Sequence, residues 1–160
     1  MSDIYKVGTL RQGQIARGYA IVRHLFPSVS FDEWKLATGT VIQRRSWLAV
    51  TDPAGTIRGL CYIFVNHQRQ SRELEVPIFA SVSLFDELGV ARELFDVAKE
   101  RARAFGYDKL HFWPAGPLGW SIVAEPEQAS VPSEGLLYDL NTDQAPEIQQ
   151  QRRDIPDAAH

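Results

Sequence analysis

Six segments of the chain have the alternating or unbroken apolar pattern that is typical of β-strands. They are residues 4–10, 46–50, 57–65, 73–83, 109–113 and 134–140. The second and third segments are separated by Asp52-Pro53-Ala54-Gly55, in which every residue but the alanine is a common turn former. We therefore expect the second and third strands to form a hairpin.

Three further segments place apolar residues three or four positions apart, as one face of an α-helix requires. The first covers residues 12–26 and ends at Pro27. The second begins after Ser30, which has the spacing of a capping box with Glu33, and ends at Gly39. The third and strongest covers residues 89–105, and Gly106 is placed to end it in the left-handed conformation.

The strand predicted over residues 73–83 carries a glutamate within an otherwise apolar pattern. Strict alternation puts one set of apolar side chains on a common face, namely Leu74, Val76, Ile78, Ala80 and Val82. Glu75 then points to the opposite face. Pro77 cannot donate a ladder hydrogen bond, so it predicts an edge, a bulge or a gap at this point of the strand.

Composition indicates one globular domain over residues 1–140. The chain has 160 residues, of which 44% are hydrophobic and 23% charged, so it can bury a core without disulfides. Residues 141–160 are polar, and we expect this tail to be disordered or loosely docked. No apolar run reaches the roughly 18 residues of a membrane span, and the N-terminus has no secretory pattern. We therefore expect no membrane contact and a cytoplasmic protein.

Charge and motifs argue against several classes of function. The net charge of −3 argues against nucleic acid as a partner. The single cysteine, Cys61, lies in an apolar run and is expected to be a buried thiol. Four scattered histidines with one thiol offer no zinc-ligand spacing, so no metal is expected. The sequence contains no Gly-x-Ser-x-Gly nucleophile elbow, no Walker loop and no His-Glu-x-x-His motif.

The loop that enters the third helix has small residues at two informative positions. Asp86-Glu87-Leu88-Gly89-Val90-Ala91 matches, at Gly89 and Ala91, the pattern Arg or Gln, two residues, Gly, any residue, Gly or Ala. Small residues let the backbone approach a pyrophosphate, and free N–H groups at the helix start attract its charge. Together with the order of elements over about residues 4–113, this motif resembles the GNAT superfamily of acyl-CoA-dependent N-acyltransferases. The alternative is an ordinary strand-to-helix turn.

The resemblance implies an α/β fold of GNAT type, with a mixed, mostly antiparallel sheet and flanking helices. It also implies transfer of an acyl group, expected to be acetyl, from acetyl-CoA to a primary amine by direct attack. The resemblance does not identify the amine or the length of the acyl chain. It also leaves the oligomeric state open, with a homodimer as one alternative. The implied CoA-binding residues are Val82, Ser83, Leu88, Gly89, Val90, Ala91 and Arg92.

Catalytic candidates follow from the same resemblance. Glu75 precedes Asp86 by eleven residues, an offset at which many GNAT enzymes carry a general base. A solvent-facing strand glutamate is an equally good interpretation, and Glu73 is the fallback candidate. Tyr138 is the candidate acid for the departing thiolate, although packing within its strand is the simpler interpretation. Trp34 is a candidate for lining an acceptor pocket.

Two acidic residues depart from the GNAT pattern. Asp86 stands where the family carries Arg or Gln, and Glu87 follows it. A carboxylate there repels a pyrophosphate by about 1 kcal/mol per close charge pair in water. At a helix start, however, it contributes roughly 0.3–1 kcal/mol of stability through the helix dipole. We therefore expect both residues to cap the helix, with Arg92 as the nearest substitute for the missing positive charge.

A second departure lies after the fifth strand. GNAT enzymes usually have an asparagine-containing turn and a helix there, and no such motif can be read in residues 114–120. Together with Asp86 and Glu87, this absence supports a second hypothesis. In it, the chain is a catalytically degenerate GNAT-fold module for ligand binding or protein interaction.

Overall fold

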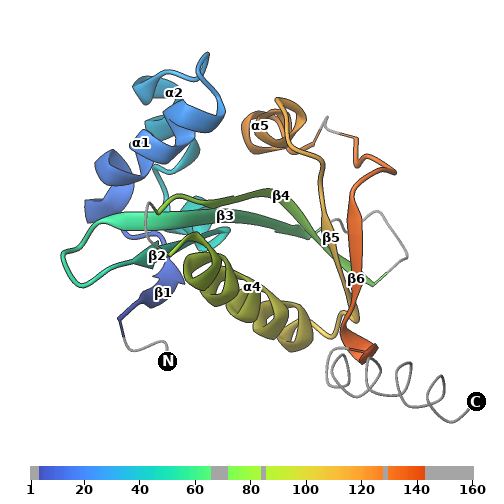
Figure 1. The fold of residues 1–160 in the computed structure, drawn as a ribbon. Helices are drawn as coiled ribbons and strands as arrows, with labels where there is room; N and C mark the ends of the chain where they lie inside the picture. The colour runs from blue at the N-terminus through green and yellow to red at the C-terminus, as the bar shows by residue number, and fades with distance from the viewer. Residues whose placement is uncertain (1–3, 66–71, 84–85, 128–129, 143–160) are drawn as a thin grey trace, which may run out of the picture.

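The computed structural model describes residues 4–65, 72–83, 86–127 and 130–142. Its centre is a six-stranded sheet whose strands lie side by side in chain order (Figure 1). The strands are β1 (Lys6–Thr9), β2 (Trp47–Thr51), β3 (Ile57–Val65), β4 (Glu73–Ser81), β5 (Lys109–Phe112) and β6 (Leu136–Asp139). Neighbouring strands are antiparallel except for β4 and β5, which are parallel. The predicted mixed, mostly antiparallel sheet is confirmed.

Helices cover both faces of the sheet (Figure 1). One face is covered by the long helix α4 (Glu87–Ala104). The other is covered by α1 (Ile15–Leu25), α2 (Phe31–Ala37) and α5 (Leu118–Ala124). The short helix α3 (Val41–Arg45) leads into β2, and two 3₁₀ turns, η1 (Gln12–Gln14) and η2 (Leu140–Thr142), precede α1 and follow β6. None of the helices in the described part of the chain has the length and apolar character needed to cross a bilayer.

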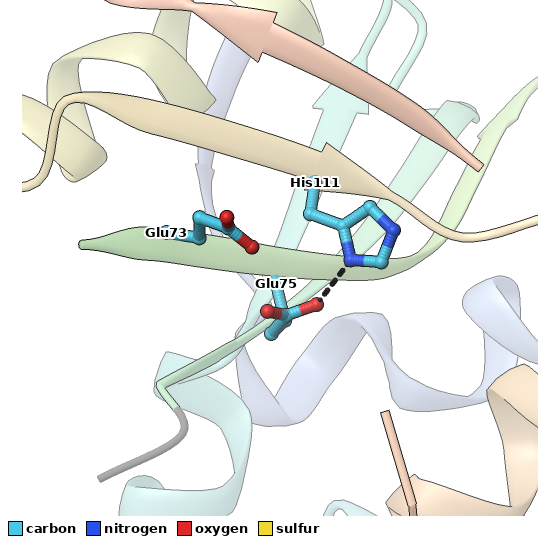
Figure 2. A group of neighbouring side chains, drawn as sticks. All are labelled: Glu73, Glu75 and His111. Atoms are coloured by element: carbon cyan, nitrogen blue, oxygen red, sulfur yellow. Dashed lines mark hydrogen bonds and ion pairs between the residues drawn. The ribbon is translucent and has the colours of Figure 1, made fainter. Parts of the chain in front are cut away.

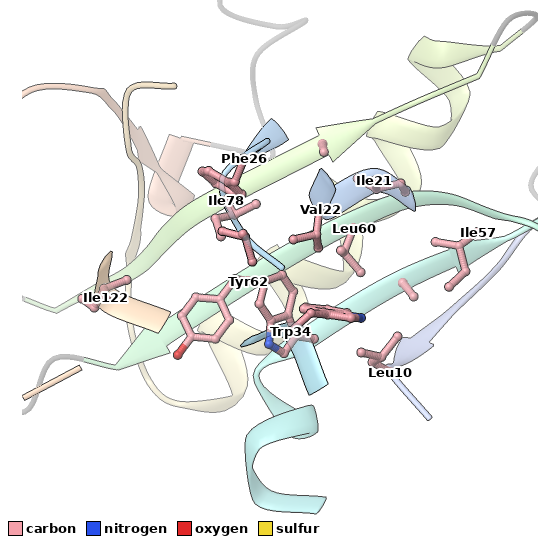
Figure 3. Close-up of a cluster of buried hydrophobic side chains, with 14 of the residues drawn as sticks. Leu10, Ile21, Val22, Phe26, Trp34, Ile57, Leu60, Tyr62, Ile78 and Ile122 are labelled. Carbon is pink, nitrogen blue, oxygen red and sulfur yellow. The ribbon is translucent and has the colours of Figure 1, made fainter. Parts of the chain in front are cut away.

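Two apolar cores result, one on each face of the sheet. The core beneath α4 is built by one stripe of that helix, Val90, Leu94, Ala98 and Ala102. The core beneath α1, α2 and α5 contains larger side chains, including Trp34, Leu60, Tyr62 and Ile122 (Figure 3). Trp47 belongs to the same core. Trp34 is fully buried and stands edge-on to Trp47 at 5.0 Å between ring centroids. The prediction that Trp34 lines an acceptor pocket is therefore wrong.

Local sequence signals account for several helix ends. The capping box before α2 is present, because the Glu33 amide donates to Ser30 Oγ at 3.1 Å and the Ser30 amide donates to Glu33 Oε1 at 2.8 Å. Gly106 follows α4 with a φ of +80°, as predicted. Helices α3 and α5 were not predicted. Their signals are a Thr40–Gln43 capping box and Pro117 at the start of α5.

A bulge at Pro77 changes the face on which β4 side chains lie. Tyr62 of β3 pairs with Ile78, but Phe64 pairs with Glu75, so β4 has one extra residue between these pairs. Leu74 and Val76 pack beneath α4, whereas Ile78 and Ala80 pack in the opposite core. The predicted bulge is confirmed, and the prediction of a single apolar face is wrong because the extra residue reverses the alternation.

The predicted C-terminal tail is described only at its start. Asn141 and Thr142 belong to η2, and residues 143–160 lie outside the described residues. The expected disorder of that tail therefore stays a prediction.

Candidate functional site

The parallel strands β4 and β5 separate halfway along β4. Within the described residues they pair from Glu73 and Lys109 to Val76 and Phe112, and the Trp113 amide donates to the Val76 carbonyl at 3.1 Å. Beyond this point residues 78–81 remain paired with β3, while their other edge has no strand partner among the described residues. Helix α5 lies against the start of this edge, since a Cβ built on Gly119 would be 2.7 Å from the Pro77 carbonyl oxygen.

Glu75 lies just before the separation and is completely buried. It stands opposite His111 in the β4–β5 register, and its Oε1 is 2.7 Å from His111 Nδ1 (Figure 2). The Trp113 indole N–H donates to the same oxygen at 2.8 Å. The alternative of a solvent-facing glutamate is therefore wrong. Whether Glu75 is a base stays a prediction.

The imidazole of His111 has a defined orientation. Its Nε2 is 2.7 Å from the carbonyl oxygen of Glu134, and a carbonyl oxygen only accepts, so Nε2 carries a proton. The contact between Nδ1 and Glu75 Oε1 joins two potential acceptors and therefore holds a further proton. The pair can thus exist as imidazolium with carboxylate or as neutral imidazole with carboxylic acid. Such a pair can store and move one proton.

Glu73 brings a second carboxylate to the same place. One oxygen each of Glu73 and Glu75 and one ring nitrogen of His111 lie within 4.8 Å of one another (Figure 2). Carboxylate oxygen and imidazole nitrogen are ligands for zinc and other divalent transition metals. Among the residues that the structure describes, these three are therefore the group that could hold a metal ion.

At the start of α4, Asp86 has the predicted capping role. Its Oδ1 accepts from the Gly89 amide at 3.1 Å, and its Oδ2 accepts from the Tyr5 hydroxyl at 2.8 Å. This hydrogen bond to Asp86 raises the pKa of Tyr5. The Gly89 amide, an expected pyrophosphate donor, is thus already bound to a carboxylate of the chain itself.

The other expected CoA-binding residues are distributed around the start of α4 and the strand before it. Val90 is fully buried in the core, whereas Leu88 is 80% exposed and Arg92 is also exposed. Ala91 is half-buried. Their side chains therefore do not form a common surface, and any contact with a pyrophosphate at this helix start would come from backbone N–H groups.

The residues just before α4 have other contacts. Val82 packs against the core beneath α1, and Ser83 Oγ accepts from the Asp86 amide at 3.1 Å. Tyr138 packs edge-on against Phe95 of α4 at 4.8 Å between centroids. Since Glu75 lies on the other face of the sheet, the structure does not bring Tyr138 and Glu75 together, and the acid role of Tyr138 stays a prediction.

Sequence reasoning missed His111 and Trp113. Both point to the face of Glu75, and their spacing of two residues on a predicted strand was a usable signal. A search for zinc-ligand spacing along the sequence does not find the pair, because His111 and Glu75 lie on different strands.

A separate hollow of about 730 Å³ lies at the opposite edge of the sheet. It is lined by β1, β2 and the turn after β2, with Lys6, Arg11 and Asp52 among its polar residues. It shares no residue with the Glu75 group or the start of α4, so we do not place the site there.

Comparison with known proteins identifies the fold. No protein-family model and no curated protein matches the chain. Among solved structures, a GCN5-related N-acetyltransferase from Kribbella flavida matches with a TM-score of 0.56 and 15% identity, over 70% of this chain and 73% of that one. An acetyltransferase from Trypanosoma brucei matches with a TM-score of 0.54 and 17% identity, over 82% of this chain and 98% of that one.

A third match is the N-acetylglutamate synthase of Neisseria gonorrhoeae complexed with coenzyme A and N-acetyl-glutamate. Its TM-score is 0.55 at 14% identity, and the match covers 68% of this chain but only 24% of the synthase. This chain thus corresponds to about a quarter of that enzyme. At such identities a likeness establishes the fold alone, and this chain has the fold of the GNAT N-acetyltransferases.

Proposed function

We propose that this chain transfers an acyl group, in the simplest case acetyl, from an acyl-CoA to a primary amine. The observation that carries the proposal is the buried Glu75–His111 pair, which lies where β4 and β5 separate. The fold supports it, because the similar structures are N-acetyltransferases and one of them is complexed with coenzyme A.

The open edge of β4 supports binding of the acyl-CoA. The Val82 amide donates to the Arg58 carbonyl of β3 at 2.7 Å, so alternation turns the backbone groups of Phe79 and Ser81 away from β3. These groups can hydrogen-bond the amides of a pantetheine arm as a neighbouring strand would. The thioester carbonyl then lies along the strand that carries Glu75.

The Glu75–His111 pair supplies the proton chemistry. An ammonium acceptor must lose a proton before its nitrogen can attack, and the Glu75 carboxylate takes that proton when the pair is in its imidazolium–carboxylate form. The neutral amine attacks the thioester carbonyl carbon and the carbon–sulfur bond breaks. The nitrogen loses its second proton as the amide forms, and the departing thiolate takes up that proton. His111 positions Glu75 and is itself oriented by the Glu134 carbonyl.

Release of free CoA thiol tests the proposal directly. The chain is incubated with acetyl-CoA and a set of primary amines, and the new thiol is followed with a chromogenic reagent. Cys61 does not interfere, because burial raises its pKa to about 12. Its expected character as a buried thiol is confirmed.

Glu75→Gln is the deciding variant. We expect turnover to fall by roughly 10²–10⁴-fold and its rise with pH to flatten, while acetyl-CoA affinity changes little. Glu100→Gln, on the exposed face of α4, is the matched control and should keep wild-type turnover. A Glu75→Gln variant with near wild-type turnover would remove Glu75 from the mechanism.

A second function, a non-catalytic binding or interaction module, is favoured by Asp86. Its carboxylate occupies the Gly89 amide that a pyrophosphate would use. Calorimetric titration with CoA and acetyl-CoA separates the two functions. Binding tighter than about 100 μM, roughly 5.5 kcal/mol, supports the transferase, and no binding at millimolar ligand supports the module.

A further inference from the structure

Glu73, Glu75 and His111 are held on two adjacent strands in positions that suit a common ligand. Glu73 and Glu75 lie two residues apart on the same face of β4, and His111 of β5 stands directly opposite Glu75. Their three potential ligand atoms lie within 4.8 Å of one another. We propose that these three residues form a binding site for one zinc ion, independent of whether the chain transfers acyl groups.

The orientation of the His111 ring makes Nδ1 the nitrogen that would bind the metal ion. Its Nε2 proton is directed at the Glu134 carbonyl, 2.7 Å away, so Nδ1 is the nitrogen that faces the carboxylates. A backbone carbonyl that holds the far nitrogen of a histidine is the usual outer partner of a metal-bound imidazole, because it fixes the ring and its tautomer. Glu134 supplies this partner from outside the group of ligands.

The charge and burial of the group favour a cation. Glu75 is 0% and His111 5% exposed, and the half-buried Glu73 places a second carboxylate beside them. A divalent ion that lies between the two carboxylates is attracted by both of them, and the attraction is strong where water is scarce. The ion takes the place of the proton between His111 Nδ1 and Glu75 Oε1, and that proton leaves to solvent.

The donor set fits zinc among the divalent transition metals. One imidazole nitrogen and two carboxylate oxygens are all zinc ligands, and three protein ligands leave a fourth position for water or another molecule. Magnesium and calcium prefer oxygen ligands alone. Glu73, the most exposed of the three, provides the side from which the ion enters. A zinc-bound Glu75 cannot accept a proton, so the zinc-bound state and the base role are mutually exclusive.

Zinc titration of the full chain, freed of metal with a chelator, tests the proposal by calorimetry. We expect one zinc ion per chain with a Kd below about 10 μM and no heat from millimolar magnesium. Glu73→Gln should weaken zinc affinity at least about tenfold, since even changes in outer partners cost 10–100-fold. His24→Gln, an exposed histidine on α1, is the matched control and should leave zinc affinity unchanged.

Cobalt substitution provides a second readout that depends on the ligands. Co²⁺ should give the visible absorption of a four-coordinate site in the wild type and not in His111→Gln. Circular dichroism shows whether His111→Gln folds. If it does not, the zinc affinity of Glu73→Gln, at a half-buried position, tests the proposal instead. No zinc uptake at 100 μM, equal zinc affinity in Glu73→Gln, or loss of affinity in His24→Gln would each overturn the proposal. CoA release by a chain that does not bind zinc would leave the proposed function standing.

Discussion

At the β4–β5 junction polar side chains from different strands point toward one another, whereas at the start of α4 a polar side chain points back at its own helix. Glu75 and His111 share a proton in a buried place. Asp86 instead accepts hydrogen bonds from the Gly89 amide and from the Tyr5 hydroxyl. The comparison teaches that the groups able to move a proton are assembled, while one amide expected to bind a pyrophosphate, that of Gly89, already donates to a carboxylate. Catalysis and CoA affinity should therefore respond to different substitutions.

The largest effect is expected at the junction, from His111→Leu. The variant leaves the Glu75 carboxylate buried without its imidazole partner, and removing one member of a buried pair costs about 3–5 kcal/mol. Urea unfolding measures this loss. The double variant Glu75→Leu, His111→Leu should recover much of it, because no uncompensated charge remains. A loss below about 1 kcal/mol in His111→Leu would show that the pair does not hold the junction together.

A smaller effect is expected where α5 meets the separating strands. Gly119→Ala places a methyl group 2.7 Å from the Pro77 carbonyl oxygen, so helix or strand must shift. We expect a loss of about 1–3 kcal/mol in unfolding free energy, despite the better helix propensity of alanine. Gly13→Ala is the control, because a Cβ there meets no atom within 4 Å. Equal stability of the two variants would mean that α5 is only loosely placed against β4.

At the start of α4, Asp86→Arg should have opposite effects on stability and affinity. Loss of the cap should lower the unfolding free energy by about 0.5–2 kcal/mol. Exchange of a repulsive for an attractive charge should tighten CoA binding about tenfold, less so at high salt. Glu87→Arg makes the same charge change without removing the Asp86 cap, so it should show the affinity gain with a smaller loss of stability, roughly 0.3–1 kcal/mol from the helix dipole. If the Asp86→Arg variant still binds no CoA, the loop is only a capped turn, and the transferase proposal is contradicted.

The smallest expected effect is on the titration of Tyr5. Its hydroxyl donates to Asp86, and this hydrogen bond to a carboxylate favours the protonated phenol and raises the pKa of Tyr5 above its usual value near 10. In Asp86→Asn the negative charge is gone, so the pKa of Tyr5 should fall toward that value. A pH series of tyrosine NMR spectra measures it, with the other tyrosines as internal references. An unchanged pKa of Tyr5 in Asp86→Asn would show that the Tyr5 hydroxyl does not donate to Asp86.

Much of the fold could be predicted because its signals are local. The Ser30–Glu33 box, the turn before β3 and Gly106 each depend on residues a few positions apart, and all three are found where predicted. The short helices α3 and α5 have too few positions to show a period. Helix α2 is equally short and was predicted from its capping box, so the Thr40–Gln43 box before α3 was a comparable signal that went unused.

The candidate site could be predicted only in part, because its contacts are long-range. Glu75 was found from its place in a strand, but His111 lies 36 residues further along and meets it only through the parallel pairing of β4 and β5. The role of Asp86 as a cap was predictable from its position, whereas its bond to Tyr5 spans 81 residues and has no sequence signal. Which strands are neighbours is therefore the information that the sequence pattern lacks.

Because β4 changes face at Pro77, the length of this strand is as constrained as its composition. Deleting one residue between Glu75 and Ile78 would restore an unbroken pleat. Either Glu75 would then turn beneath α4, or Ile78 and the residues after it would leave the core under α1. Neighbouring side chains can repack around a substitution. A deletion instead moves the side chains of half the strand to the opposite face of the sheet. This strand should therefore tolerate exchanges of similar residues and reject insertions and deletions.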